Sequence, residues 1–274
     1  MKKLMMAAAL AAFCGAVQAD GITSANTVGY NTTKVKGGQF YMVGVQLADV
    51  ASADETADFN TAFKTDCVPG EYGDGNDFTY GNAPMIQVLQ SNGQAYDFYY
   101  YISDAYDSSD KPVVGNCWAD ASGYILTSDV AMQLSKGFWF KSETDGSITA
   151  AGQVSVLNDF ERIVPANQFE IVANPYPVAL CLNSPTTAGF APGEYGDGND
   201  FTYGNAPMIQ VLQSNGQAYD FYYYISDAYD SSDKPVVGNC WADASGYILN
   251  GAQVNVGSAF WIKSATSGKF TFSL

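Results

Sequence analysis

The sequence contains one long segment twice. Residues 69–126, from PGEYGDGNDFTYGNAPMIQVLQ to ADASGYIL, recur without a change at residues 192–249. The flanks repeat with substitutions, since QFYMV at 39–43 corresponds to QFEIV at 168–172 and FWFKS at 138–142 to FWIKS at 260–264. The chain is therefore two copies of a unit of roughly 120 residues, a usual domain size. Because packing tolerates many substitutions of similar volume, full identity indicates recent duplication or sequence exchange and does not mark a site.

Local signals within each unit favour strands. Residues 85–90 and 95–102 flank Asn92-Gly93, and Asn-Gly supplies the positive φ angles of a tight hairpin turn. Because side chains alternate along a strand, this turn predicts two sets of cross-strand pairs. One face pairs Leu89 with Tyr96, Gln87 with Phe98 and Met85 with Tyr100, and the other pairs Ile86 with Tyr99 and Val88 with Asp97. Further β-rich runs are 28–35, 40–47, 123–126, 138–141 and 147–154.

These patterns predict an all-β fold of two tandem β-sandwich or small-barrel modules, at residues 20–153 and 154–274. One short helix is expected in the first module. Ser52 and Glu55 have the spacing of a capping box, and Phe59 and Phe63 fall on one side of a turn or two of helix. The corresponding connection in the second module is six residues shorter, so any helix there is a single turn.

The first nineteen residues, MKKLMMAAALAAFCGAVQA, have the pattern of a secretory signal peptide. Lipid attachment at Cys14 is the alternative, which Phe13 disfavours. Removal of Lys2 and Lys3 lowers the 12 basic residues to 10 against 28 acidic ones, a net charge of −18. This charge excludes the footprint of a nucleic-acid-binding protein. No later run reaches the length of a membrane helix, so we expect a secreted or cell-surface protein without a membrane span.

Four cysteines remain after cleavage, namely Cys67, Cys117, Cys181 and Cys240. An even number in an exported protein favours disulfides, and the repeat favours one bridge in each copy, Cys67 with Cys117 and Cys181 with Cys240. Each bridge would close a loop of about fifty to sixty residues and contribute roughly 4 kcal/mol in the chain-entropy model. The alternative is four free buried thiols.

The aromatic run of the hairpin offers a candidate contact surface. The face with Leu89, Tyr96 and Phe98 is the more apolar, so we expect it to form the core. The opposite face then exposes the candidate ligand-binding tyrosines, which are Tyr99, Tyr101, Tyr222 and Tyr224, and exposed rings stack on sugars or on a partner chain. The alternative is that both faces are covered, because a strand that is apolar on both sides is usually buried.

The acidic loop after each aromatic run offers a candidate calcium site. Its carboxylates are Asp104, Asp107 and Asp110 and their copies Asp227, Asp230 and Asp233, and hard oxygen ligands in loops suit Ca²⁺. A second acidic group contains Glu71, Asp74, Asn76 and Asp77. Neither group has the signature of a calcium-binding loop. The other interpretation is an ordinary turn, because Asp commonly bonds its own backbone there.

Catalytic chemistry finds little support in the residues. The chain has no histidine, which removes Ser-His-Asp and Cys-His nucleophile activation and the usual zinc sites. Gly73-Asp74-Gly75 lacks the Lys of a phosphate-binding loop. A glycosidase needs only two carboxylates, but 28 acidic residues supply such pairs by chance. We therefore expect no enzyme and no cofactor apart from the calcium alternative.

Two segments of the second copy carry a family resemblance. FEIVANPYP at 169–177 and GSAFWI at 257–262 resemble the "GWNLIxNPxP … GxGFWI" β-modules of exported bacterial proteins, found in Verrucomicrobia, Lentisphaerae and Bacteroidetes-type bacteria. The first copy departs from this pattern at Val43-Gly44-Val45-Gln46, where Asn-Pro is expected. The resemblance implies an all-β module, secretion, and no catalytic motif.

Two functions follow as hypotheses. The first is a structural or interaction protein of the cell exterior, built from two acidic β-modules that bind other surface proteins. The second is a carbohydrate-binding module that uses the exposed tyrosines. An open aromatic face with polar neighbours favours the sugar, whereas a flat patch or a free strand edge favours assembly.

Overall fold

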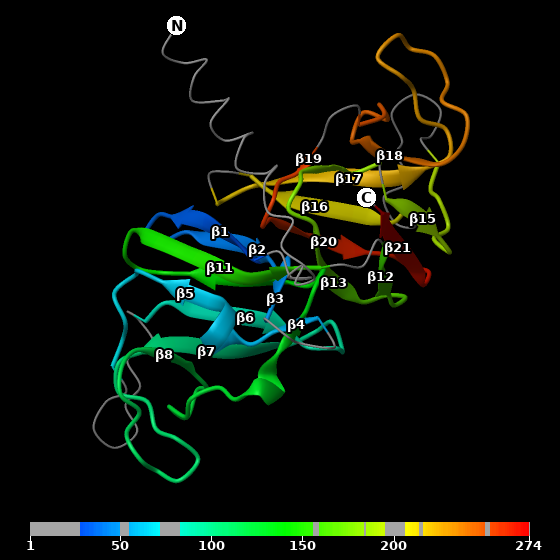
Figure 1. The fold of residues 1–274 in the computed structure, drawn as a ribbon. Helices are drawn as coiled ribbons and strands as arrows, with labels where there is room; N and C mark the ends of the chain where they lie inside the picture. Colours follow the sequence, from blue (N-terminus) through cyan, green and yellow to red (C-terminus); the bar gives the residue numbers. More distant parts are fainter. Residues whose placement is uncertain are drawn as a thin grey trace, which may run out of the picture.

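The computed structural model describes residues 28–49, 55–71, 83–155, 159–183, 185–194, 206–213, 216–249 and 253–273. The expected signal peptide lies outside these ranges. Within them the chain is nearly all β, as the sequence predicted, and its small antiparallel sheets have an arrangement like that of a four-bladed propeller. Figure 1 shows the first repeat, blue to green, on one side of the second, which runs to red.

The first repeat forms two main sheets. One contains β1 (Val28–Val35), β11 (Gly146–Val154), β3 (Leu47–Ala48) and β5 (Phe63–Thr65). The other has the order β2 (Phe40–Gly44), β10 (Gly137–Lys141), β6 (Met85–Leu89), β7 (Tyr96–Ile102), β8 (Cys117–Ala119). The remaining elements are the paired strands β4 (Thr56–Ala57) and β9 (Met132–Gln133), helix α2 (Phe59–Ala62) and the 3-10 helix η1 (Ser128–Val130).

The second repeat has the same arrangement, with a three-stranded sheet in place of the four-stranded one. That sheet contains β12 (Asp159–Val164), β21 (Gly268–Ser273) and β15 (Thr186–Ala188). The five-stranded sheet has the order β13 (Phe169–Ala173), β20 (Ala259–Lys263), β16 (Met208–Leu212), β17 (Tyr219–Ile225), β18 (Cys240–Asp243). Strands β14 (Leu180–Cys181) and β19 (Gln253–Val254) form a separate pair.

The hairpin of β6 and β7 has the register that the Asn-Gly turn predicted. All five expected pairs are present, from Leu89 with Tyr96 to Met85 with Tyr100. The type of turn differs from the expected one, because only Gly93 has a positive φ, 65°. Asn92 instead accepts hydrogen bonds through Oδ1 from the backbone N–H groups of Gln94 and Ala95. The loop thus has four residues and a glycine at the left-handed position, a common hairpin geometry.

The core of the first repeat joins its two main sheets. The four-stranded sheet contributes buried residues such as Leu47, Phe63 and Ile148, and the five-stranded sheet contributes Trp118 and Phe138. A corresponding cluster in the second repeat contains Trp241, Phe260 and Phe270. Burial of large aromatic side chains from both sheets supplies the main driving force for folding.

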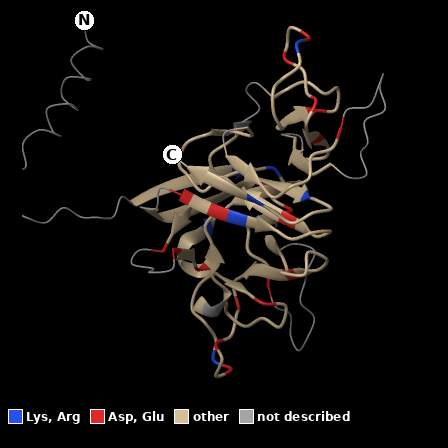
Figure 2. Ribbon diagram, turned by 90° about the vertical axis from the view of Figure 1, so that its right-hand side faces the viewer, with Lys and Arg blue, Asp and Glu red and all other residues tan. Residues whose placement is uncertain are grey.

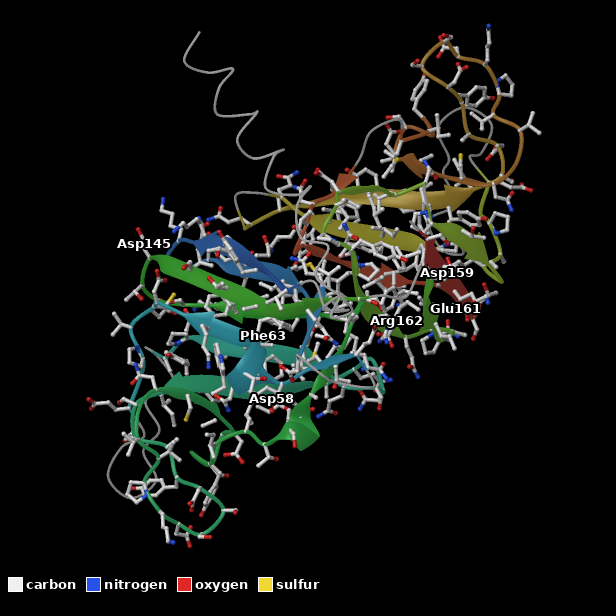
Figure 3. All side chains as sticks on the ribbon, viewed as in Figure 1. Asp58, Phe63, Asp145, Asp159, Glu161 and Arg162 are labelled. Atoms are coloured by element: carbon white, nitrogen blue, oxygen red, sulfur yellow. The ribbon has the colours of Figure 1, made fainter. Side chains whose placement is uncertain are left out.

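Helix α2 is shorter than expected and begins later. Asp58 is its N-cap and accepts hydrogen bonds from the N–H groups of Asn60 (2.7 Å) and Thr61 (3.1 Å). Phe63 already lies in β5, and Figure 3 shows Asp58 and Phe63 close to this single turn. The predicted capping box was wrong, because Glu55 has a positive φ of 49° outside the helix; Ser52 lies outside the described residues.

Candidate functional site

The two repeats pack against each other through their five-stranded sheets, and we call this contact the seam. Its centre is a cluster of buried residues from β2, β10, β13 and β20, which are Met42, Trp139, Ile171, Ala173 and Ala259. Glycines allow the close approach. A Cβ at Gly137 would lie 2.5 Å from Ala259 Cβ, and one at Gly44 would lie 2.8 Å from Ala173 Cβ. Real Cβ atoms do not approach so closely, so these positions require glycine.

Backbone hydrogen bonds cross the seam in two places. The N–H of Gly44 donates to the carbonyl of Gly257, and the N–H of Ala173 donates to the carbonyl of Ser135, both at 2.8 Å. Gly44 and Ala173 are equivalent positions of the two copies, as are Ser135 and Gly257, so the two bonds are related by a pseudo-two-fold axis. The repeats therefore meet as the subunits of a symmetric dimer do.

Aromatic rings line the seam around this axis. Trp139 and Trp261 are equivalent, and their ring centroids lie 6.3 Å apart. Each tryptophan also contacts a hairpin tyrosine of the other repeat edge-on: Tyr96 lies 6.3 Å from Trp261 and Tyr219 lies 6.4 Å from Trp139. Such pairs stabilise beyond the area that they bury.

Two cavities open beside these rings, and they are equivalent by residue. The Trp139 cavity has a volume of about 250 Å³ and is lined by Phe40, Gln87, Trp139, Leu212, Gly216, Gln217 and Tyr219. The Trp261 cavity has about 440 Å³ and is lined by Phe169, Gln210, Trp261, Leu89, Gly93, Gln94, Tyr96 and Tyr219. Each thus combines a Phe and a Trp of one repeat with the hairpin of the other.

Polar groups with few protein partners lie in both cavities. Among the described residues, the amide nitrogens of Gln87 and Gln210 contact only the sulfur atoms of Met85 (3.8 Å) and Met208 (4.0 Å), and sulfur is a weak acceptor. Both side chains are half-buried. The indole N–H of Trp261 is buried and finds no hydrogen-bond partner among the residues that the structure describes. Because a half-buried amide without a strong partner costs free energy, Gln87 and Gln210 favour a ligand that supplies acceptors.

The tyrosines that the sequence offered as a contact surface lie on the core side of the sheet. Tyr99 packs on Phe59 with 5.6 Å between centroids, and Tyr101 packs on Trp118 at 5.2 Å. In the second repeat Tyr222 packs against the core and Tyr224 is only 8% exposed. The expected assignment of faces was therefore wrong: the Tyr99 face meets the larger core, and the face with Leu89 and Tyr96 forms the seam.

Burial of Tyr99 gives a test of this packing at alkaline pH. Burial raises the pKa of Tyr99 to about 12, and the charges of Asp97 and Asp120 add to the shift. An unfolded tyrosine titrates near pH 10. The folded state therefore holds this proton more tightly, so stability that is present below pH 10 is lost between pH 10 and 12. Urea unfolding from pH 8 to 11.5 is expected to show a smaller loss in Tyr99→Phe; an equal loss contradicts the buried placement.

The acidic loops use their carboxylates within turns. Asp107 Oδ1 accepts hydrogen bonds from the N–H groups of Ser109 (2.8 Å) and Lys111 (3.0 Å), and the Tyr124 hydroxyl donates to Asp110 Oδ1 at 2.6 Å. The second copy repeats these bonds at Asp230 and Asp233. No three Asp, Glu, His or Cys side chains in the described ranges are grouped to hold a metal ion. The geometry thus favours turns over calcium at Asp107, Asp110 and their copies, and Asp104 and Asp227 belong to no such group in the described ranges; Asp74 and Asp77 lie outside the described residues.

All four described cysteines are free thiols, so the expected disulfides were wrong. Cys67 belongs to the core between the main sheets, whereas Cys117 belongs to a cluster on the other face of the five-stranded sheet. Adjacent residues of β8 point to opposite faces, and Trp118 takes the core side. In the second repeat Cys240 lies in the corresponding outer cluster, while Cys181 Sγ donates to the Leu249 carbonyl at 3.7 Å.

Thiol titration tests the free cysteines. Burial raises the pKa of the Cys117 and Cys240 thiols, and the thiolate is the reactive form. In a folded chain of residues 20–274, Cys117 and Cys240 are therefore expected to react slowly with a thiol reagent at pH 8. After unfolding without reductant, all four thiols are expected to react quickly. Reaction of only two thiols, or of none, would show that one or two disulfides are present.

Comparison with protein-family models, curated proteins and solved structures found no match to this chain. In the described part of the chain, no helix has the length and apolar character needed to cross a membrane.

Proposed function

We propose that this is a secreted or cell-surface, non-catalytic protein that binds neutral carbohydrate in the two seam cavities. The observation that carries the proposal is the combination, in both cavities, of aromatic rings with the amides of Gln87 and Gln210, which in the described part of the chain contact only a weak sulfur acceptor. Ligand pockets typically have this composition, in which apolar rings provide most of the contact and a few polar groups fix orientation.

The chemistry of a pyranose matches these groups. Its faces present C–H groups that stack on a Trp or Tyr ring, and its hydroxyls pair with an amide, which both donates and accepts hydrogen bonds. The net charge of −16 disfavours anionic ligands. Figure 2 shows acidic residues distributed over the molecule and grouped with a basic residue at the tips of two protruding loops.

A binding assay on a panel of neutral oligosaccharides tests this function. Gln87→Ala with Gln210→Ala is expected to weaken binding about tenfold at each site, since a hydrogen bond contributes roughly 1 to 1.5 kcal/mol. Tyr99→Phe with Tyr222→Phe is the matched control, because both rings face the cores, and its binding should equal that of the parent. The absence of any neutral ligand, or equal binding by the glutamine variant, would contradict the proposal.

A structural or interaction role is the second candidate, with each repeat serving as a sandwich-like module. The loops at 103–116 and 226–239 protrude from opposite ends of the molecule (Figure 1), and Val114 and Val237 on them are fully exposed. Two identical loops that each expose one valine at opposite ends of the molecule suit self-assembly. This role predicts concentration-dependent association in analytical ultracentrifugation that Val114→Asp with Val237→Asp abolishes; a monomer at all concentrations contradicts it.

A further inference from the structure

A third cavity lies beside the Trp139 cavity, on the β2 side of the seam. It has a volume of about 250 Å³, and its lining includes Thr33, Tyr41, Asn255 and Ser258. Phe40, Leu212 and Gly216 line both this cavity and the Trp139 cavity. The two cavities therefore adjoin and form one groove, which we call the long groove.

The pseudo-two-fold axis places different residues at the equivalent positions on the other side. Val35 and Val164 are equivalent, because they pair with the equivalent glycines Gly146 and Gly268. Thr33 and Arg162 each lie two residues before these valines and therefore correspond to each other. Tyr41 pairs with Phe140 and Glu170 pairs with the equivalent residue Ile262, so Glu170 is the counterpart of Tyr41. Lys136 and Ser258 each precede the first residues of β10 and β20, so they correspond as well.

These three replacements form a charged cluster. Arg162 Nη2 bonds Glu170 Oε2 at 2.8 Å, and both side chains are largely buried. Burial lowers the pKa of Lys136, and the charge of Arg162 lowers it further while Glu170 raises it. Figure 3 shows Arg162 next to Glu161 and Asp159 on β12. Long charged side chains thus occupy the side opposite to the small hydroxyl-bearing Thr33 and Ser258.

We propose that the long groove binds a neutral, glucose-configured oligosaccharide longer than a disaccharide, whereas the Trp261 side binds only a short one. This inference rests on the proposed carbohydrate function. The long groove combines two adjoining cavities of about 250 Å³ each, and the Trp261 cavity alone has about 440 Å³, so the difference in ligand length rests on the charged cluster and not on volume. Glucose-configured sugars have equatorial hydroxyls and hence flat C–H faces, which suit the rings of Trp139, Tyr219 and Phe40. Thr33, Asn255 and Ser258 supply hydroxyl and amide groups for the further units.

Calorimetric titration of the full chain with glucose oligomers of two to six units, in β-1,4, β-1,3 and α-1,4 linkage, tests the inference. We expect one site per chain to bind a tetrasaccharide at least about tenfold more tightly than a disaccharide. Thr33→Arg with Ser258→Lys introduces the charged residues found at the equivalent positions of the Trp261 side and should remove this gain while disaccharide binding persists.

A second variant with the converse substitutions keeps the test decisive if the first variant does not fold. Arg162→Thr with Glu170→Tyr and Lys136→Ser should give two sites per chain that gain with chain length. The long groove would be overturned if the parent binds a disaccharide but its affinity does not rise with chain length. It would also be overturned if that rise is unchanged in Thr33→Arg with Ser258→Lys. Either result would leave the carbohydrate function standing. No binding of any glucose oligomer would overturn the long groove proposal, and the carbohydrate function itself would fall only if no neutral oligosaccharide of the wider panel binds.

Discussion

Replacement of Trp118 by alanine is expected to lower the free energy of unfolding by about 3 to 5 kcal/mol, as for other buried Trp or Phe residues. Trp118 is 0% exposed. Its ring packs on Tyr101 and on Phe140, and its indole N–H donates to the Phe63 carbonyl at 3.1 Å. The variant therefore leaves a cavity and a carbonyl without its donor.

Denaturant unfolding measures this effect, and Val114→Ala is the matched control. Val114 is 100% exposed, so its truncation should change stability by less than about 0.5 kcal/mol. Trp241→Ala is expected to behave like Trp118→Ala, because the second repeat has the same contact of Trp241 with Tyr224. A loss below about 1 kcal/mol for Trp118→Ala would contradict the described core.

Gly137→Ala is expected to destabilise the protein by about 1 to 3 kcal/mol, the usual effect of overpacking. The new methyl group would lie 2.5 Å from Ala259 Cβ and 2.6 Å from Ile171 Cγ2. Both neighbours belong to the other repeat, so the methyl group forces the seam apart and exposes apolar surface. Thermal unfolding and binding of a hydrophobic dye measure the two consequences.

Gly29→Ala provides the control, since Gly29 also lies in a strand and has only ordinary contacts, the nearest at 3.6 Å to Leu47. Its replacement should be neutral or slightly stabilising, because alanine restricts the unfolded chain. Equal effects of the two substitutions would show that the repeats do not meet at Gly137.

Local features of this fold were predictable from the sequence. The Asn92-Gly93 turn determined the hairpin register, and the β-rich run at 28–35 coincides with β1. Both depend on neighbours within a few residues. The start of the helix was mispredicted, because the residue directly before Phe59 is Asp58, and its carboxylate caps the turn in place of the expected pair Ser52 and Glu55.

The faces of β7 could not be assigned from its pattern. The strand has aromatic residues on both sides, with Tyr96 and Phe98 on one and Tyr99 and Tyr101 on the other. Which face meets the core depends on the partner sheet and on the other repeat. The cysteines illustrate the same limit, because an even count says nothing about distance across a sheet.

The seam cavities were missed because their residues come from strands far apart in the chain. Phe40, Gln87 and Trp139 lie on three strands of one repeat, and Tyr219 comes from the other. One signal was present in the sequence, the Phe-Trp pair at 138–139 that recurs at 260–261. In both copies Phe enters the core and Trp enters the seam, as alternation along a strand requires.

Tryptophan fluorescence during titration with a glucose tetrasaccharide tests the central claim most directly. The chain has four tryptophans, of which Trp118 and Trp241 lie in the cores and Trp139 and Trp261 in the seam. Binding in the seam predicts an emission change in the parent that persists in Trp118→Phe with Trp241→Phe and disappears in Trp139→Phe with Trp261→Phe. An unchanged emission of the parent, or a change that survives the loss of both seam tryptophans, would contradict the account.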